Sequence, residues 1–341
     1  MTDNIATPFA KPLYVMLKPA GAHCNLACKY CYYLEKNNLY DKSHRHIMSD
    51  EMLEQFTREY IEAQTMPQVL FTWHGGEPLM RSIDFYKKAL ALQKKYARGR
   101  RIDNVIQTNG TMLTDEWCEF FAQNNWLVDI YMQFTPIVER LTQHQDGRTL
   151  ASLADNHEIP LADFSVTPEQ WGNFLCAIFE EWVHNDVGKM FVEIFDCTLA
   201  NWMGVLPGIC AYSKNCGHAG VMEHNGDVYS CDHFVFPEYK LGNIRDHTLI
   251  EMLYGDKQHA FSRLKHTSLP RQCKECDMEF ACHGECPKNR FEKDKYGEPG
   301  LNYLCKGYFQ YYSHVAPYMD FMKRELQAQR PPANIMEALK K

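Results

Sequence analysis

Three cysteines lie close together near the start of the chain, at a spacing that could support metal chemistry. Cys24, Cys28 and Cys31 fall within "AHCNLACKYCYYLEK", and two tyrosines follow the third cysteine directly. A structural zinc site is closed by four ligands, and this local set offers only three. A metal centre on these thiolates would therefore keep one open position, and an open position is where chemistry happens.

Eight more cysteines gather in the C-terminal part of the chain. They are Cys210, Cys216, Cys231, Cys273, Cys276, Cys282, Cys286 and Cys305. Clustered cysteines in a reducing compartment are more often metal ligands or redox groups than disulfides. Thiolate chemistry alone leaves two readings open: iron–sulfur clusters, or a zinc knuckle on Cys273, Cys276, Cys282 and Cys286.

The remaining cysteines, Cys118, Cys176 and Cys197, have apolar helical or strand-like surroundings. Such thiols usually behave as small buried hydrophobes, so we expect them in the core and not at a site.

Composition and charge narrow the classes of function. The 341 residues are 45% hydrophobic and 23% charged, with a formal net charge of -7. This balance is typical of a globular protein and argues against a nucleic-acid or anionic-membrane partner. No apolar stretch is long enough for a signal peptide or a membrane span, so we expect a cytoplasmic protein.

The elements that must position the first three cysteines alternate between strand and helix. Strand-like segments at 13–21, 68–76 and 104–110 are separated by helices whose expected N-caps are Ser49 and, after the third strand, Thr114. This order predicts parallel strands with right-handed crossovers, in a barrel or an open sheet. The loops after the three strands carry the cysteines, Gly75-Gly76-Glu77-Pro78 and Asn109-Gly110, and we expect them to meet on one rim.

The alternation stops after a fourth strand-like run at 126–140, and residues 141–165 are expected to form a polar surface excursion. Thr167 and Gln170 then predict a capping box for a helix that buries Trp171, Phe174, Ile178 and Trp182. Residues 221–231 are a predicted hairpin with Asn225-Gly226 as a type I′ turn. We therefore divide the chain into a shortened barrel core (1–140), a connecting segment with one long helix (141–205) and a cysteine-rich domain ending in a helix (206–341).

The spacing C-x3-C-x2-C after a first strand, together with "HGGEP" at 74–78, resembles the radical S-adenosylmethionine (SAM) superfamily. The resemblance implies a 4Fe–4S cluster on Cys24, Cys28 and Cys31, whose fourth iron is chelated by SAM. It also implies that the HGGEP loop meets the methionine end of SAM, a task for which glycine allows close approach.

The C-terminal cysteines resemble a SPASM domain, which holds two auxiliary 4Fe–4S clusters. By that pattern Cys210, Cys216, Cys231 and Cys286 would bind the first, and Cys273, Cys276, Cys282 and Cys305 the second. Full cysteine ligation suits electron transfer. The implied fold is α/β: a partial (β/α) radical SAM barrel, shortened, followed by this iron–sulfur domain.

Within the superfamily, the chain is most similar to anaerobic sulfatase-maturating enzymes, which convert a cysteine or serine of a sulfatase to Cα-formylglycine. The similar segments include "FTWHGGEPLMR", "IQTNGTMLTDEWCEFF", "NGDVYSCDHFVFPEYKLGNI" and "CKECDMEFACHGECPKNRF". Asp232 matches the catalytic base of that family. Tyr33, Gly75, Gly76, Glu77 and Val138 match positions that contact SAM, although an apolar residue such as Val138 is more often plain core.

The resemblance implies an oxidoreductase whose SAM-derived radical removes a hydrogen from Cβ of the target while Asp232 accepts a proton. The implied partners are an unfolded sulfatase segment and an electron donor such as flavodoxin or ferredoxin. The sequence leaves cysteine and serine targets both open.

The chain departs from the family in one respect. In the family, a segment like "YMQFTPIVER" comes roughly 70 residues further after the third βα unit than it does here, an interval close to two βα units. The lost stretch would include the serine and arginine that bind the SAM carboxylate. Two alternatives therefore remain open: another SPASM-type peptide modifier, such as a thioether-forming enzyme, and a truncated metal-binding protein without catalysis.

Overall fold

The computed structural model describes residues 13–28, 31–33, 36, 39–40, 46–124, 126, 134–142, 149–150 and 159–340. These residues form two compact units, each described here by itself. The first comprises Met1–Asp129 and Gly217–Phe261, and the second comprises Ile130–Cys216 and Ser262–Lys341. This division differs from the three-part division predicted above, because the segment after residue 217 returns to the sheet of the first unit.

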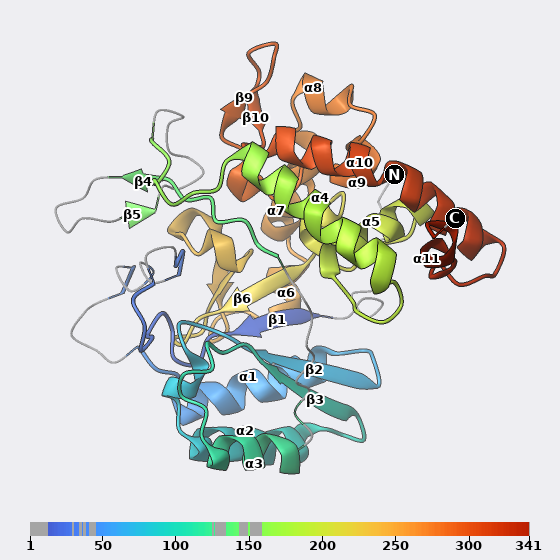
Figure 1. The fold of residues 1–341 in the computed structure, drawn as a ribbon. Coiled ribbons are helices and arrows are strands. Elements are labelled where there is room, and N and C mark those ends of the chain that lie inside the picture. Colours follow the sequence, from blue (N-terminus) through green and yellow to red (C-terminus); the bar gives the residue numbers. More distant parts are fainter. Residues whose placement is uncertain are drawn as a thin grey trace, which may run out of the picture. The chain divides into compact units, whose positions relative to one another are not determined.

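The first unit is a six-stranded mixed sheet with helices on one face (Figure 1). Its strand order is β3-β2-β1-β6-β7-β8, in which β1 is parallel to both β2 and β6, and the last three strands are antiparallel. The strands are β1 (Tyr14–Leu17), β2 (Gln68–Trp73), β3 (Arg101–Ile106), β6 (Ala219–Met222), β7 (Asp227–Tyr229) and β8 (Lys240–Asn243). The three predicted parallel strands are confirmed.

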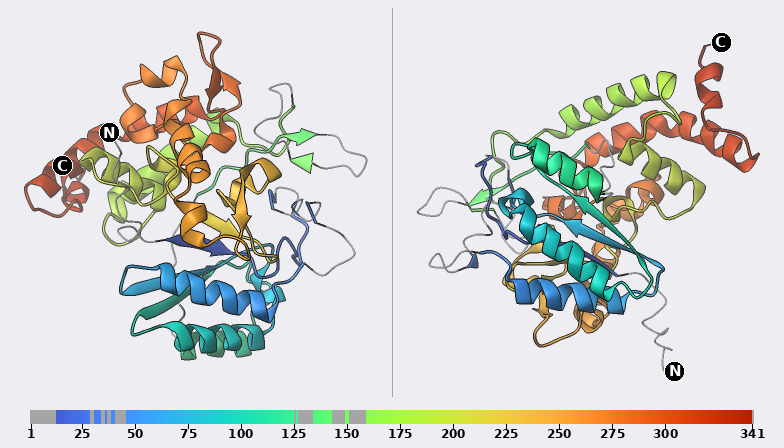
Figure 2. Two further views of the ribbon diagram at one scale, coloured as in Figure 1. Left: turned by 180° about the vertical axis from the view of Figure 1, so that it is seen from behind. Right: turned by 90° about the horizontal axis from the view of Figure 1, so that it is seen from below.

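Helices of the first unit follow the predicted start signals. Ser49 caps α1 by accepting a hydrogen bond from the Met52 N–H, and Thr114 caps α3 through the Trp117 N–H. The helices are α1 (Asp50–Ala63), α2 (Ile83–Tyr96), α3 (Asp115–Gln123) and α6 (Leu249–Leu253), and α7 (Asp256–Thr267) leads into the second unit. Figure 2 shows α1, α2 and α3 along the same face of the sheet, where an aromatic core around Phe56, Trp73 and Tyr86 is buried.

The hairpin of β6 and β7 is confirmed, but its turn is not type I′. A type I′ turn needs positive φ at both central residues. Gly226 has φ of 88°, whereas Asn225 is not among the described non-glycine residues with positive φ. The Gly226 N–H donates to the Glu223 carbonyl and the Glu223 N–H to the Asp227 carbonyl, which makes a three-residue loop.

The predicted fourth strand at 126–140 is wrong for the part that the structure describes. Residues 134–139 form no strand, and Arg140 makes only an isolated bridge with Leu161. Pro136 lacks the N–H that a strand ladder requires, which explains the interruption. Residues 125 and 127–133 lie outside the described residues, as do 143–148 and 151–158 of the predicted surface excursion.

The second unit is mainly helical. Its long helices α4 and α10 pack closely, since a Cβ on Gly307 would overlap the Pro168 carbonyl. The elements are β4 (Leu141–Thr142), β5 (Thr149–Leu150), α4 (Pro168–Asn185), α5 (Glu193–Met203), α8 (Arg271–Lys274), α9 (Glu279–Cys282), β9 (Glu292–Lys293), β10 (Pro299–Leu301), α10 (Cys305–Gln327) and α11 (Asn334–Ala338).

Helix α4 begins with the predicted capping box between Thr167 and Gln170. Its buried stripe differs in part from the prediction, because Phe174 is 39% exposed. The stripe runs through Trp171, Leu175, Phe179 and Trp182, at the three- and four-residue spacing of one helix face.

Candidate functional site

The loops that follow β1, β2 and β3 meet, as the strand order predicts. The Gly76 N–H donates to the Gly21 carbonyl at 2.8 Å, and the Glu77 N–H donates to the His23 carbonyl at 2.9 Å. The Asn109 side-chain amide reaches the Cys24 Sγ at 3.7 Å. The rim of the sheet therefore joins all three loops beside the first cysteine.

Glycine is required where the second loop touches the first. Gly75 has φ of 138°, and a Cβ there would lie 3.0 Å from the Gly21 carbonyl oxygen. A Cβ on Gly76 would overlap the His23 carbonyl, so no larger residue fits without moving the chain. These glycines place the HGGEP loop directly against the segment that leads into the three cysteines.

Glu77, predicted to contact SAM, is fully buried and holds two loops together. One carboxylate oxygen accepts from the Leu79 N–H and the Thr108 hydroxyl, and the other accepts from the Asn109 N–H, each at 2.8 Å. Both oxygens thus have protein partners, and the carboxylate ties the end of β2 to the end of β3.

The three thiols of the N-terminal motif lie on irregular backbone and are half-buried. Cys24 Sγ accepts from the Leu26 N–H at 3.4 Å, and the Cys31 N–H donates to the Cys28 carbonyl at 3.1 Å. Main-chain N–H donors beside a thiolate stabilise its negative charge. The three thiols thus belong to one partly open loop, which suits a group that also binds a ligand from outside.

Asp232 lies in a short 3-10 turn (Asp232–Phe234) directly after Cys231 and is held by two neighbours. The Tyr32 hydroxyl donates to its Oδ2 at 2.5 Å, and Lys18 Nζ lies 3.9 Å from the same oxygen. Burial alone would raise the pKa of this carboxyl, but His233, Lys18, His74 and the Tyr32 hydrogen bond outweigh it. Together they hold the pKa of Asp232 well below its usual range, so the carboxylate is ionised at physiological pH.

Lys18 is the centre of this buried group, and its side chain has no exposed surface. Its Nζ contacts His74 Nδ1 at 2.9 Å and lies 3.8 Å from the centre of the Tyr33 ring. Burial lowers the pKa of Lys18, and the negative charges of Asp232 and Glu223 oppose that shift. The ammonium is therefore balanced by carboxylates on the first unit itself.

The tautomer of His74 follows from its contacts. Its Nδ1 accepts from the Gly75 N–H at 2.7 Å as well as from Lys18, so the ring proton resides on Nε2. Burial and then Lys18 lower the pKa of His74 to about 3. The imidazole is consequently neutral at physiological pH.

Tyr33, predicted to pack on the adenine of SAM, is only 2% exposed in the structure. Its hydroxyl donates to the Glu223 carboxylate, and Lys18 lies over its ring. Val138, predicted to line the adenosine, is buried in the core of the second unit. Neither contact tests the SAM predictions, which stay predictions.

Sequence reasoning missed Lys18, Tyr32 and His74 as members of the site. A signal was present, because Lys18 follows the apolar run "YVML" directly and a lysine is seldom fully buried unless it is paired. His74 opens the HGGEP loop, but only the fold brings it against Lys18.

In the second unit, the thiols of Cys273, Cys276, Cys282 and Cys305 form one group. Burial raises the pKa of Cys273 to about 12, and the nearby charges of Cys305 and Cys276 contribute to this shift. Burial likewise raises the pKa of Cys282, with Cys305 and Cys273 as further causes. These mutual effects place the four thiols in one electrostatic neighbourhood, and their role as ligands of the second auxiliary cluster stays a prediction.

Cys210, Cys216 and Cys286 form another group in the same unit. Burial raises the pKa of Cys216 to about 11, and Cys210 adds to the shift. The charges of Cys210 and Cys216 also raise the pKa of Cys286. Cys231, the fourth predicted ligand of this cluster, belongs to the first unit.

Among the residues that the structure describes, no three Cys, His, Asp or Glu side chains converge as one metal ion requires. A zinc knuckle would need its sulfurs within about 2.3 Å of one ion.

The three cysteines expected in the core differ from one another. Cys197 is buried and donates to the Pro207 carbonyl, and Cys176 is half-buried. The prediction is wrong for Cys118, which is exposed on α3 because the buried face of that helix carries Trp117, Phe120 and Phe121.

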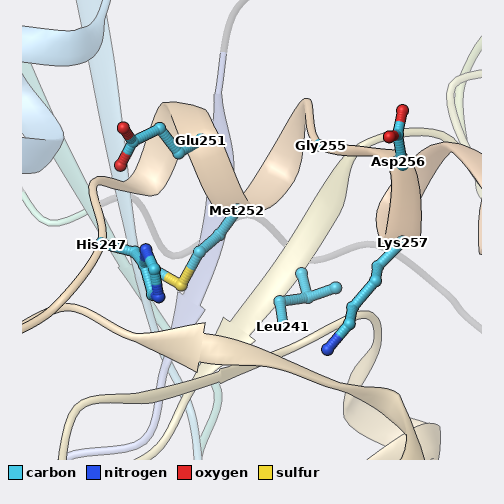
Figure 3. Close-up of a pocket in the computed structure, with 7 residues that line it drawn as sticks. All are labelled: Leu241, His247, Glu251, Met252, Gly255, Asp256 and Lys257. Atoms are coloured by element: carbon cyan, nitrogen blue, oxygen red, sulfur yellow. The ribbon is translucent and has the colours of Figure 1, made fainter.

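A shallow pocket of about 240 Å³ lies elsewhere on the first unit (Figure 3). Leu241, His247 and Met252 line it together with Glu251. Glu251 already accepts hydrogen bonds from the main chain and hydroxyl of Thr248. None of the predicted site residues lines this pocket, so it is not the candidate site.

No described helix is both long enough and apolar enough to cross a membrane.

Comparisons with known proteins agree with the arrangement of these motifs. Residues 19–135 match the radical SAM superfamily, and residues 216–277 match SPASM, an iron–sulfur cluster-binding domain. The solved structure of native anSMEcpe with bound AdoMet aligns with a TM-score of 0.77 at 23% identity, over 92% of this chain and 100% of that chain. That likeness shows the same fold.

Two sequence relatives are informative. A serine-type anaerobic sulfatase-maturating enzyme of Bacteroides thetaiotaomicron is 61% identical, over 100% of this chain and 98% of the relative. A serine-type enzyme of Klebsiella aerogenes is 31% identical, over 92% of this chain and 87% of the relative. The first alignment spans 406 positions against 341 residues here, so at least 65 positions of that relative have no counterpart in this chain. The chain is therefore a radical SAM enzyme that belongs to the family of anaerobic sulfatase-maturating enzymes.

Proposed function

We propose that this enzyme oxidises a serine in an unfolded sulfatase segment to Cα-formylglycine, with Asp232 as the base. The observation that carries the proposal is Asp232 itself, a largely buried carboxylate kept ionised by Lys18 and hydrogen-bonded by Tyr32. Such a carboxylate can accept the hydroxyl proton of the substrate while the Tyr32 hydroxyl stabilises its charge.

The preference for serine rests on the relatives. The serine-type enzymes of Bacteroides thetaiotaomicron and Klebsiella aerogenes are 61% and 31% identical to this chain. A cysteine-type enzyme of Clostridium perfringens is 25% identical. The chain thus resembles the serine-type enzymes more closely, and this similarity favours a serine target.

The residues present fit the cofactors of the family. Cys24, Cys28 and Cys31 would hold the cluster that binds SAM, with the carbonyls of Gly75 and Gly76 available to the methionine ammonium. The auxiliary clusters would take the sets Cys210, Cys216, Cys231 and Cys286, and Cys273, Cys276, Cys282 and Cys305. When bound, SAM and the clusters supply the hydrogen-abstracting radical and the acceptor for the second electron.

We further propose that the positions missing relative to the Bacteroides enzyme follow the third βα unit. In support, the described sheet takes only β1, β2 and β3 from the first 140 residues, and its next strand is β6. A flavodoxin or ferredoxin is the proposed electron donor, and the cytoplasm the proposed compartment, because reduced thiol clusters need a reducing environment.

The test uses two peptides of one sulfatase-like sequence, one with serine and one with cysteine at the target position. Anaerobically reconstituted enzyme, SAM and a reductant are mixed with each peptide, and the aldehyde is captured and measured by mass spectrometry. We expect formylglycine from the serine peptide with release of 5′-deoxyadenosine. Deoxyadenosine release without aldehyde from either peptide would overturn the proposal, and a thioether product would favour the alternative peptide modifier.

A further inference from the structure

The second unit contains a fully buried lysine that the proposed reaction does not use. Lys265 lies in α7 and has no exposed surface. Its ammonium donates to the main-chain carbonyls of Cys210 at 2.5 Å and Ala211 at 2.6 Å. Both acceptors are neutral, so these hydrogen bonds fix the position of the charge without neutralising it.

The negative groups around Lys265 are mostly proposed cluster ligands. Burial lowers the pKa of Lys265, and Cys216, Glu285, Cys286 and Cys210 oppose that shift, in this order. Glu285 is itself buried, and its pKa is raised by that burial. A buried ammonium is costly unless a negative charge compensates it, and a thiolate-ligated cluster would provide one.

Arg290 provides a contrast in the same unit. Its guanidinium donates to the carbonyls of His283 and Gly284 at 2.6 and 2.8 Å. The thiols whose charge favours the guanidinium are Cys273, Cys282 and Cys286, which come from both proposed clusters. Lys265 is therefore the more selective charge, because it is hydrogen-bonded to the main chain of Cys210, a proposed ligand of the first set, whereas the carbonyls bound by Arg290 lie between Cys282 and Cys286, which belong to different sets.

We propose that Lys265 raises the reduction potential of the auxiliary cluster to which Cys210, Cys216 and Cys286 of the second unit are assigned, and leaves the other auxiliary cluster nearly unaffected. A fixed positive charge stabilises the reduced cluster, which carries one more negative charge than the oxidised one. This makes the first auxiliary cluster a better acceptor for the electron that the substrate releases. The inference rests on the cluster ligands given under the proposed function.

The test is a potentiometric titration of the full-length reconstituted protein, followed by electron paramagnetic resonance. Cys24, Cys28 and Cys31 are replaced by alanine in all samples, so that only the auxiliary clusters give signals. Lys265→Gln keeps an amide donor for the two carbonyls but removes the charge, whereas Lys265→Arg keeps the charge. Lys189→Gln, at an exposed lysine of the same unit after α4, is the matched control.

We expect Lys265→Gln to shift one midpoint potential downward, so that the ratio of reduced to oxidised cluster at the original midpoint falls about tenfold, equivalent to about 59 mV for one electron. The second midpoint potential should stay in place in Lys265→Gln. Both midpoint potentials should stay in place in Lys265→Arg and in Lys189→Gln. Unchanged or equally shifted midpoints in Lys265→Gln would overturn the inference, as would loss of iron from that variant and from Lys265→Met. The titration does not measure formylglycine, so it still tests the role of Lys265 if the maturation assay fails. If the parent protein contained no auxiliary iron, the proposed ligand sets would be wrong.

Discussion

The two regions that carry thiols differ in how many ligands they offer and in what surrounds them. In the first unit, Cys24, Cys28 and Cys31 lie half-buried on one loop that joins the rim of a parallel sheet. In the second unit, one proposed set of four thiols lies on short helices and turns and on the first residue of α10; its members are Cys273, Cys276, Cys282 and Cys305. Three ligands on an open loop leave a coordination position for a reacting molecule, whereas four ligands close the site for electron transfer.

The buried lysines of the two regions differ in the groups that surround them. Lys18 lies beside the Asp232 carboxylate, the proposed base. Lys265 is bound to carbonyls and lies near the thiols proposed to hold the first auxiliary cluster. Under the two proposals, similar burial of an ammonium would serve proton transfer in one unit and electron transfer in the other.

The largest expected effect comes from breaking one thiol set at a time. Cys28→Ser should reduce release of 5′-deoxyadenosine to background, because the open cluster would lose one of only three protein ligands. Cys276→Ser should keep deoxyadenosine release but lower formylglycine formation. The two products are measured together by chromatography and mass spectrometry.

Cys118→Ser is the control for both variants, because this thiol is exposed on α3 and should not affect either product. If Cys28→Ser still cleaved SAM at the rate of the parent enzyme, the distinction between an open and a closed thiol set would be wrong.

A smaller effect should follow from disturbing the loop contact that supports the three thiols. Gly76→Ala would push a methyl group into the His23 carbonyl, and we expect a loss of about 3 kcal/mol or more in the free energy of unfolding. Iron at the N-terminal motif should fall while auxiliary iron is retained, as measured by iron content and denaturant unfolding.

Gly188→Ala provides the comparison, because Gly188, unlike Gly76, has a positive φ, of 78°, and its Cβ would make only an ordinary contact with the Ala333 side chain at 3.8 Å. Its cost should be about 1 kcal/mol from backbone strain alone. Equal losses in the two variants would show that the Gly76 contact does not matter.

The smallest effect concerns the neutral imidazole beside Lys18. The pKa of His74 is about 3 in the folded protein and near 6.5 when unfolded, so the unfolded chain binds the extra proton first as the pH falls. The contribution of the neutral His74 imidazole to the free energy of unfolding is complete above about pH 6.5 and decreases as the pH falls below that value. Between pH 7.5 and 6.0 the loss should be about 0.8 kcal/mol.

His74→Gln should remove this pH dependence of the unfolding midpoint, whereas His184→Gln, at an exposed position on α4, should keep it. If the unfolding midpoint of His74→Gln varied with pH as it does in the parent protein, His74 would bind its proton equally well in the folded and unfolded states.

Much of the first unit could be predicted because its signals are local. N-caps such as Ser49 and Thr114 depend on a few neighbouring residues, and the cysteine spacings are visible without any fold. The hairpin at Gly226 was predictable, but its turn type was not, because a single glycine fits several loops.

The rest depended on contacts between distant residues. Lys18 meets His74 across 56 positions and Tyr32 meets Asp232 across 200, so no periodicity or spacing connects them. The motif assigns Glu77 to the cofactor, which stays a prediction, and the structure adds that its oxygens accept hydrogen bonds from Leu79, Thr108 and Asn109. Such tertiary hydrogen bonds decide a polar residue's role only after the chain has folded.

The role of Asp232 is tested most directly by comparing the two products in Asp232→Asn with those in Asp246→Asn, at an exposed aspartate of the same unit. Removing an ionised base should lower formylglycine formation at least about 10²-fold, while deoxyadenosine release stays near that of the parent enzyme. Asp246→Asn should retain both. Formylglycine and deoxyadenosine formed by Asp232→Asn in the parent ratio and at the parent rate would contradict the account.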